Sequence, residues 1–227
     1  SQSFRFALDA GAPAGATINP TNGTFTWTPT EAQGPSTNTV IIRVTDEGTP
    51  ATNTAIAVTV MVNELNTAPQ PAAISNQTLN EGSVISLAAA ADDADLPAQT
   101  LTYSLVSAPA GASINTTNGQ FLWTPTEAQG PSTNVITVRV TDSGSPSLSA
   151  SNTFTLVVNE VNAAPVLAPV GDQVVNEGST LAFTVAATDS DLPALTLSFL
   201  LDAGAPVGAV VDPASGAFSW TPTSAQA

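Results

Sequence analysis

The sequence WTPTEAQGPSTN occurs at residues 27–38 and again at residues 123–134, and a third copy opens with WTPT at residues 220–223. The tryptophans that begin these copies are 96 and 97 residues apart. Self-similarity at one fixed period is the sequence signature of an array of structural units. We therefore expect one fold to be repeated along the chain with a period of about 96 residues.

Two further motifs recur at the same spacing, so the repeat extends well beyond the tryptophan. NEGS occurs at residues 80–83 and 176–179. VNELNTAP at residues 62–69 is followed by VNEVNAAP at residues 158–165. Both pairs are separated by 96 residues, which places the whole chain in one repeat frame.

The repeat frame predicts three units. We expect a complete copy at residues 69–164, preceded by the C-terminal part of a first copy at 1–68 and followed by the N-terminal part of a third copy at 165–227. A proline opens the second and third units, which restricts the backbone there to extended conformations. On this prediction the chain begins and ends within a repeat and is a window on a longer array.

Each copy has the pattern of an all-β domain, because short β-rich runs are bounded by clusters of Gly, Pro, Asn and Asp. The pair Asn118-Gly119 predicts a hairpin turn, since both residues tolerate a positive φ. Seven short strands in about 96 residues fit a sandwich of two sheets. In the complete copy the predicted strands are Ile74–Leu79, Val84–Ala91, Thr100–Ser107, Ala112–Asn115, Gln120–Thr124, Val135–Thr141 and Asn152–Val158.

An aromatic residue lies two positions before each tryptophan, and this spacing places both rings on one face of a strand. In the complete copy the pair is Phe121 and Trp123. We expect these rings to anchor the core, with a sugar-stacking platform as the alternative. Arg43 and Arg139 lie inside predicted strands, and we expect them to pair with nearby carboxylates.

The composition excludes several classes of function. The chain has 227 residues, 18 acidic residues, three Arg, no Lys, His or Cys, and a formal net charge of −15. Without His or Cys, the usual zinc sites and imidazole or thiolate catalysis are excluded. Three positive charges cannot neutralise a run of phosphates, so we expect no nucleic-acid partner. No apolar stretch approaches the roughly 20 residues of a membrane-spanning helix, so we expect no membrane insertion in this segment.

The ordered set NEGS, DxDLP, APxGAxI, NG, WTPTEAQG, VTDxGxP and VNEVNxAP resembles bacterial cadherin-like repeats. These repeats are grouped with the immunoglobulin-like and dystroglycan-type cadherin-like domains of large surface proteins. The resemblance covers all 227 residues. It implies all-β, tandem seven-stranded Greek-key β-sandwiches arranged head to tail, a location outside the cell, and an adhesive or spacing role.

Cadherins bind calcium between successive domains, and the resemblance maps their ligand motifs onto acidic residues at two predicted junctions. The NEGS and TPTE glutamates and the linker acid come from one repeat, while the DxD pair and the VTD aspartate come from the next. At the first junction the implied ligands are Glu31, Glu64, Asp93, Asp95 and Asp142. At the second junction they are Glu81, Glu127, Glu160, Asp189 and Asp191.

The chemistry of these residues also favours calcium, independently of the resemblance. Calcium takes six to eight oxygen ligands, several of them carboxylates. Without a cation, five carboxylates at one junction would repel and raise one another's pKa, and the chain has no Lys to compensate. Solvated loop acids are the alternative. The linkers carry Asn63 and Asn159 where the family has acids, which leaves the number of ions open.

The sequence therefore predicts structural or adhesive spacer repeats of a large extracellular bacterial surface or filament protein, rigidified by calcium at the junctions. The expected partners are neighbouring repeats of the same array, and homophilic self-assembly stays open. The alternative is a glycan- or polymer-binding module that uses loops at the end of the sandwich. We expect no enzyme, because the acids recur at equivalent positions of each repeat, whereas a glycosidase uses one pair of carboxylates.

Overall fold

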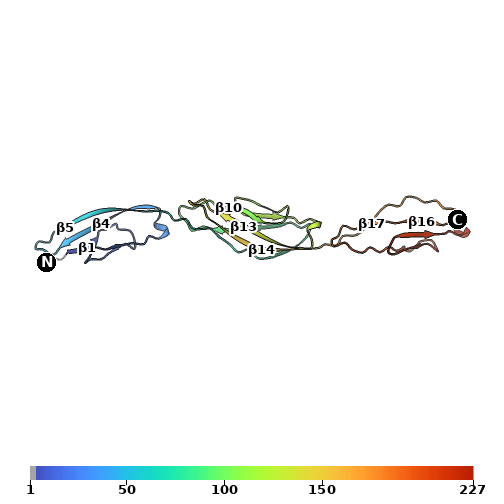
Figure 1. Cartoon of the computed structure of the whole chain (residues 1–227), viewed down its shortest axis with the longest axis horizontal. Coiled ribbons are helices and arrows are strands. Elements are labelled where there is room, and N and C mark those ends of the chain that lie inside the picture. The colour runs from blue at the N-terminus through green and yellow to red at the C-terminus, as the bar shows by residue number, and fades with distance from the viewer. Residues whose placement is uncertain (1–3, 227) are drawn as a thin grey trace.

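The computed structural model describes residues 4–226 and shows three β-rich units that follow one another in an elongated array (Figure 1). This part of the chain contains strands and short 3₁₀ turns, so the predicted all-β class is confirmed. The turns are η1 (Glu31–Gln33), η2 (Glu127–Gln129) and η3 (Ser224–Gln226). Between residues 4 and 226 no helix is long and apolar enough to cross a membrane.

The middle unit is a sandwich of two sheets, of which the larger contains a long hairpin. The order of this sheet is β10 (Thr102–Ser107), β13 (Ser132–Thr141), β14 (Ser149–Asn159) and β7 (Gln77–Asn80). In the antiparallel hairpin of β13 and β14, Ser132 lies opposite Val158 and Thr141 lies opposite Ser149. Strand β7 pairs with β14 in the parallel direction, which brings the end of β7 beside the end of β14.

The second sheet of the middle unit carries the aromatic pair. Its order is β11 (Ser113–Ile114), β12 (Gln120–Trp123) and β8 (Ile85–Ala88), and β6 (Gln70–Pro71) pairs with β9 (Ala91–Asp92) in a separate ladder. The turn between β11 and β12 contains Gly119 at φ +69°, so the predicted Asn-Gly hairpin is confirmed.

The seven predicted strands of the middle unit are all present, with three differences in their extent. The first predicted strand is joined by an additional short piece, β6, and the second is divided into β8 and β9. Strands β13 and β14 begin three residues earlier than predicted. All but one of the added residues are polar, so apolar alternation does not mark them as strand. They are strand because they pair within the long hairpin.

The outer units contain the same kinds of ladder. The first unit has the sheet β1 (Phe4–Leu8), β4 (Ser36–Asp46), β5 (Asn53–Val62) and the pair β2 (Thr17–Ile18), β3 (Phe25–Thr26). The third unit has the sheet β16 (Leu181–Thr184), β19 (Ala217–Trp220), β18 (Val210–Val211) and the pair β15 (Val166–Leu167), β17 (Ala187–Thr188). Both sets match strands of the middle unit at the repeat spacing.

The core of the middle unit is built on the predicted aromatic pair. Phe121 and Trp123 are fully buried, and Phe121 meets Phe154 of β14 edge to face with ring centroids 5.9 Å apart. Aromatic pairs prefer this edge-to-face geometry. The role of Trp123 as a core anchor is thus confirmed, whereas Trp27 and Trp220 in the outer units are half-buried.

The motif that follows each tryptophan forms a turn held by one shared carbonyl. In the middle unit the Trp123 indole and the Gln129 side-chain amide both donate to the carbonyl oxygen of Ala110, at 3.1 and 3.0 Å. The Gln129 side chain also accepts from the Thr126 backbone N–H at 3.0 Å. The turn η2 is therefore tied to the core, and Glu127, its first residue, takes a fixed position at the end of the sandwich.

The two strand arginines differ from one another. Arg43 donates two hydrogen bonds to Asp9, of 2.9 and 2.7 Å, as expected. For Arg139 the expected pairing is wrong, because it forms no ion pair with any residue of the range 4–226. The middle unit has Val106 at the position that Asp9 takes in the first unit, so the acidic partner is missing.

Candidate metal centres at the junctions

Three glutamates from separate elements converge at the end of the middle unit that faces the third unit. Glu81 follows β7, Glu127 opens η2, and Glu160 follows β14. A carboxylate oxygen from each lies within 4.8 Å of the others. We call these three residues the second-junction cluster.

Backbone hydrogen bonds hold the second-junction cluster together. The Glu81 N–H donates to the Asn159 carbonyl at 3.1 Å, which continues the pairing of β7 with β14. The Gly82 N–H donates to the Pro125 carbonyl at 2.8 Å, which ties the same turn to the segment before Glu127. The parallel pairing of β7 and β14 thus brings Glu81 beside Glu160, and the bond between Gly82 and Pro125 adds Glu127 to them.

The carboxylates of the second-junction cluster are buried without sufficient partners. The Glu81 side chain is 8% exposed, and its Oε1 accepts from the Val161 N–H at 3.0 Å. Four other buried oxygens find no hydrogen-bond partner among the described residues: Glu81 Oε2, Glu127 Oε1, and Oε1 and Oε2 of Glu160. A buried carboxylate without a partner is unfavourable unless it is protonated or coordinates a cation.

The electrostatics agree with the geometry. Burial raises the pKa of Glu127 above its ordinary value, and the nearby charges of Glu81 and Glu160 raise it further. Burial likewise raises the pKa of Glu160, followed by the charges of Glu81 and Asp191. The mutual repulsion expected from the sequence is therefore present, and a cation in the cluster would relieve it.

The third unit contributes Asp189 and Asp191 next to this cluster, although neither belongs to the tight group of three. Asp191 is 2% exposed, and its two carboxylate oxygens accept from the Ala163 N–H of the linker at 3.0 and 3.1 Å. Asp189 accepts from the Asp191 N–H at 3.0 Å. These bonds fix the DxD segment of the third unit against the linker.

The first junction repeats this plan with a different set of three. Oxygens of Glu31, Glu64 and Asp95 lie within 4.8 Å of one another, and we call these residues the first-junction cluster. Both carboxylate oxygens of Glu64 are buried without a hydrogen-bond partner in the described part of the chain. Burial raises the pKa of Glu64, and the charges of Glu31 and Asp95 add to the effect.

Direct hydrogen bonds also cross the first junction. Glu31 of the first unit accepts from the Leu96 N–H of the middle unit at 3.0 Å. Asp95 accepts from the N–H and the hydroxyl of Thr67 in the linker, at 2.9 and 2.6 Å. Two members of the first-junction cluster therefore form hydrogen bonds beyond their own unit: Glu31 with the middle unit, and Asp95 with the linker.

The other two acids expected at the first junction lie outside its cluster. One oxygen of Asp93 accepts from the Asp95 N–H at 3.1 Å, and the other is buried without a partner among residues 4–226. Asp142 accepts from the N–H groups of Gly144 and Leu148 and so holds its own loop. Burial acts to raise the pKa of Asp142, but these bonds and one from Asn66 outweigh it and lower the pKa.

Two polar residues of the first junction were not singled out by the sequence. Thr67 donates to Asp95, and Gln99 donates from Nε2 to Asp95 at 2.8 Å and to Asn66. Neither is itself acidic, and Gln99 lies in none of the recurring motifs. The available signal was the difference between repeats, because the third unit has Leu195 where the middle unit has Gln99.

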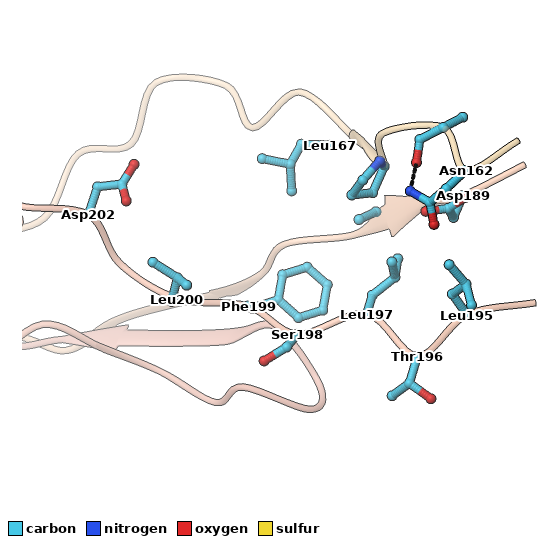
Figure 2. Close-up of a pocket in the computed structure, with 13 residues that line it drawn as sticks. Asn162, Leu167, Asp189, Leu195, Thr196, Leu197, Ser198, Phe199, Leu200 and Asp202 are labelled. Carbon is cyan, nitrogen blue, oxygen red and sulfur yellow. Dashed lines mark hydrogen bonds between the residues drawn. The ribbon is translucent and has the colours of Figure 1, made fainter. Parts of the chain in front are cut away.

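A cavity of about 500 Å³ lies in the third unit. Figure 2 shows that Leu197, Phe199 and Leu200 from one segment and Leu167 from the opposite side line it. In the middle unit Tyr103, at the position of Phe199, pairs with β13 and is buried. The cavity is thus the interior face that the hairpin of β13 and β14 covers in the middle unit, and its apolar lining is core material.

Comparisons with solved structures agree with this fold. Mouse cadherin-23 repeats EC22–24 superpose with a TM-score of 0.59 at 20% identity, covering 98% of this chain and 76% of that one. Human CDH23 repeats EC21–23 give a TM-score of 0.56 at 21% identity, covering 95% and 81%. At these identities the likeness shows the fold alone.

One curated relative and one family model match the sequence. Chitinase A of Pseudoalteromonas piscicida is 38% identical over 141 residues, which are 61% of this chain and 16% of that protein. The family model described as "Putative Ig domain" (He_PIG) matches three successive segments, residues 1–63, 66–159 and 164–227. The chain therefore belongs to the He_PIG family of immunoglobulin-like domains and carries them in tandem.

Proposed function

We propose that these repeats are a structural spacer in a larger extracellular bacterial protein, and that calcium at the junctions between repeats makes the spacer rigid. The observation that carries the proposal is the second-junction cluster, in which Glu81, Glu127 and Glu160 converge and four buried oxygens have no partner among the described residues. The residues present fit a hard cation with oxygen ligands.

Calcium suits this donor set better than magnesium does. Calcium accepts six to eight oxygens in a flexible geometry, whereas magnesium demands a near-ideal octahedron and retains water. The second junction offers carboxylates from three elements of one unit, with Asp189 and Asp191 close by on the next. A cation held by both units would fix the angle between them, because its ligands must converge within about 2.3–2.6 Å.

An extracellular location is part of the proposal, and the usual affinity of such calcium modules supports it. Extracellular calcium modules bind with a Kd of about 10⁻⁴–10⁻³ M, so they are loaded outside cells. The relationship to a region of a chitinase supports a role as a spacer between other modules of a longer protein. In this role the repeats do no chemistry, and adhesion through them would be a property of the assembled array.

The spacer role is favoured over binding of a polysaccharide by the repeats themselves. Sugar-binding platforms use exposed aromatic rings, but the four aromatic residues of the middle unit are all buried. They are Tyr103, Phe121, Trp123 and Phe154. The loops at its two ends carry acids and amides, which suit a cation better than a pyranose face.

The test is calcium-dependent thermal unfolding of the whole chain. Calcium at about 100 times its Kd should stabilise the folded state by about 2.7 kcal/mol, and excess chelator should remove this gain. Glu160→Gln should abolish most of the calcium response. Glu177→Gln is the matched control, because Glu177 is the NEGS glutamate of the third unit and is exposed. Equal midpoints in calcium and chelator for the unmodified chain would refute the proposal.

A further inference from the structure

The linker residue Asn66 is inserted into the end of the middle unit at the first junction. Its Nδ2 donates to Asp142 Oδ2 and to the Pro146 carbonyl, both at 3.0 Å. Its Oδ1 accepts from Nε2 of Gln99. Both halves of the Asn66 amide are therefore bonded to the middle unit, although the residue belongs to the chain that leaves the first unit.

Gln99 completes this arrangement from the other side. Its Nε2 donates to Asn66 and also to Asp95, which in turn accepts from Thr67 of the linker. The orientation of the Gln99 amide follows from chemistry, because a carboxylate can only accept and so must face the nitrogen. The neutral Nε2 of Gln99 thus lies between an oxygen of Asn66 and an oxygen of Asp95, and it bridges them as a bound cation could.

The site has room for Asn66 because a glycine faces it. A Cβ added to Gly144 would overlap the Asn66 side-chain amide. The backbone of Gly144 is not in the left-handed region, so glycine is required here for space and not for its conformation. Asp95 and Asp142, the two acids of the arrangement, are 2% and 5% exposed, so both aspartates are shielded from water.

The Gln99 side of this connection has no counterpart at the second junction. The repeat spacing maps Asn66 onto Asn162 and Gln99 onto Leu195. Figure 2 shows Leu195 as an apolar side chain on the opposite side of this region, where it can donate nothing.

We propose that the Asn66–Gln99 pair is a latch that holds the first junction without a cation, so that the two junctions respond differently to cation removal. The latch uses neutral amides between buried acids and needs no ion from solution. The contrast with the second junction rests on the proposed function, since it is there that a cation would be the main link between units.

The test is pulsed electron–electron double resonance, which measures the distance between two spin labels across each junction of the full chain. The chain has no cysteine of its own, so labels can be attached at introduced cysteines. Thr59→Cys with Ser104→Cys reports the first junction. Thr155→Cys with Leu200→Cys reports the second at equivalent positions. In excess chelator the first pair should keep a narrow distance distribution, while the second should broaden relative to calcium.

Gln99→Leu, which installs the residue of the third unit, should broaden the first-junction distribution in chelator. Gly144→Ala should do the same by displacing Asn66, while exposed Gln70→Leu should not. The latch is overturned if the first junction of the unmodified chain broadens in chelator as much as the second, or if Gln99→Leu leaves it unchanged. If neither junction responds to calcium but Gln99→Leu still broadens the first, the latch stands and the calcium proposal fails.

Discussion

Three glutamates of the junctions, Glu64, Glu127 and Glu160, bind protons more tightly in the folded chain than in the unfolded chain. Burial and neighbouring charge raise the pKa of Glu64, Glu127 and Glu160 above the ordinary 4.5. A raised pKa of an acid means that the folded state gains stability as these groups become protonated. A cation competes with the protons for the same oxygens.

Stability should therefore depend on pH with opposite sign in chelator and in calcium. In chelator, lowering the pH from 7 towards 4.5 should increase the free energy of unfolding, because the folded-state pKa values of the three glutamates lie above 4.5. In calcium the same change should decrease it, because protons displace the ion. Urea unfolding followed by tryptophan fluorescence gives both curves, and two parallel curves would contradict the account.

The most acidic part of the same curves of unfolding free energy against pH serves as an internal control. Asp9, Asp46 and Asp212 have a pKa below the ordinary 3.8, chiefly through hydrogen bonds from Arg43, Thr52 and Ser215, respectively. Their stabilisation is present above pH 3.8 and is lost as the pH falls through their folded pKa. Stability should thus decline at the acid end with and without calcium.

Individual acids of the candidate sites were predictable, while their neutral partners were not. Each member of the second-junction cluster lies in a motif that recurs, such as the glutamate of NEGS or TPTE. Gln99 is uncharged and lies in no recurring motif. Its role depends on its closeness to Asn66 of the linker, which only the folded chain defines. The failed pairing of Arg139 has the same origin, since a single change to Val106 in another strand removes its partner.

At the scale of elements, the tight hairpin of β11 and β12 is a sensitive point of the middle unit. Gly119 has φ +69° and is buried, and a Cβ there would overlap the Ala89 carbonyl and lie 3.0 Å from the Tyr103 ring. Gly111 also has a positive φ, of +82°, but nothing lies within 4 Å of its Cβ position. Substitution of Gly111 therefore tests backbone strain alone, whereas substitution of Gly119 tests backbone strain together with a steric clash.

Gly111→Ala should cost about 1–2 kcal/mol of unfolding free energy, which is the penalty for a left-handed alanine. Gly119→Ala should cost about 3 kcal/mol or more, because overpacking is added to the same penalty. Urea titration of both variants measures the difference. Equal losses would mean that the turn relaxes and that the backbone of Ala89 is not fixed by the sheet.

The strands themselves were largely readable from the sequence, because apolar alternation marks the core face of each one. The sequence did not predict β6 or the separation of β8 from β9. Strand β6 is only two residues long, and the separation depends on where strand pairing is interrupted. The parallel pairing of β7 with β14 could not be read locally. It joins residues about 80 positions apart, such as Gln77 and Leu156, and it brings Glu81 beside Glu160 in the second-junction cluster.

For the whole molecule, repetition is the source of both the shape and the candidate function. The units follow one another in a line (Figure 1). The middle unit carries acids at both ends, and an acidic cluster lies at each of its two junctions. The net charge of −15 is in this sense distributed among junctions as well as over the surface. A line of units with fixed junctions is a rod, and with free junctions it is a flexible chain.

The central claim is tested most directly by small-angle X-ray scattering of the whole chain in calcium and in excess chelator. Calcium should give the larger radius of gyration and maximum dimension, and chelator should reduce both, mainly through bending at the second junction. Glu160→Gln in calcium should resemble the unmodified chain in chelator, while Glu177→Gln should resemble it in calcium. Superimposable scattering curves of the unmodified chain in the two buffers would contradict the claim that a cation sets the stiffness of this array.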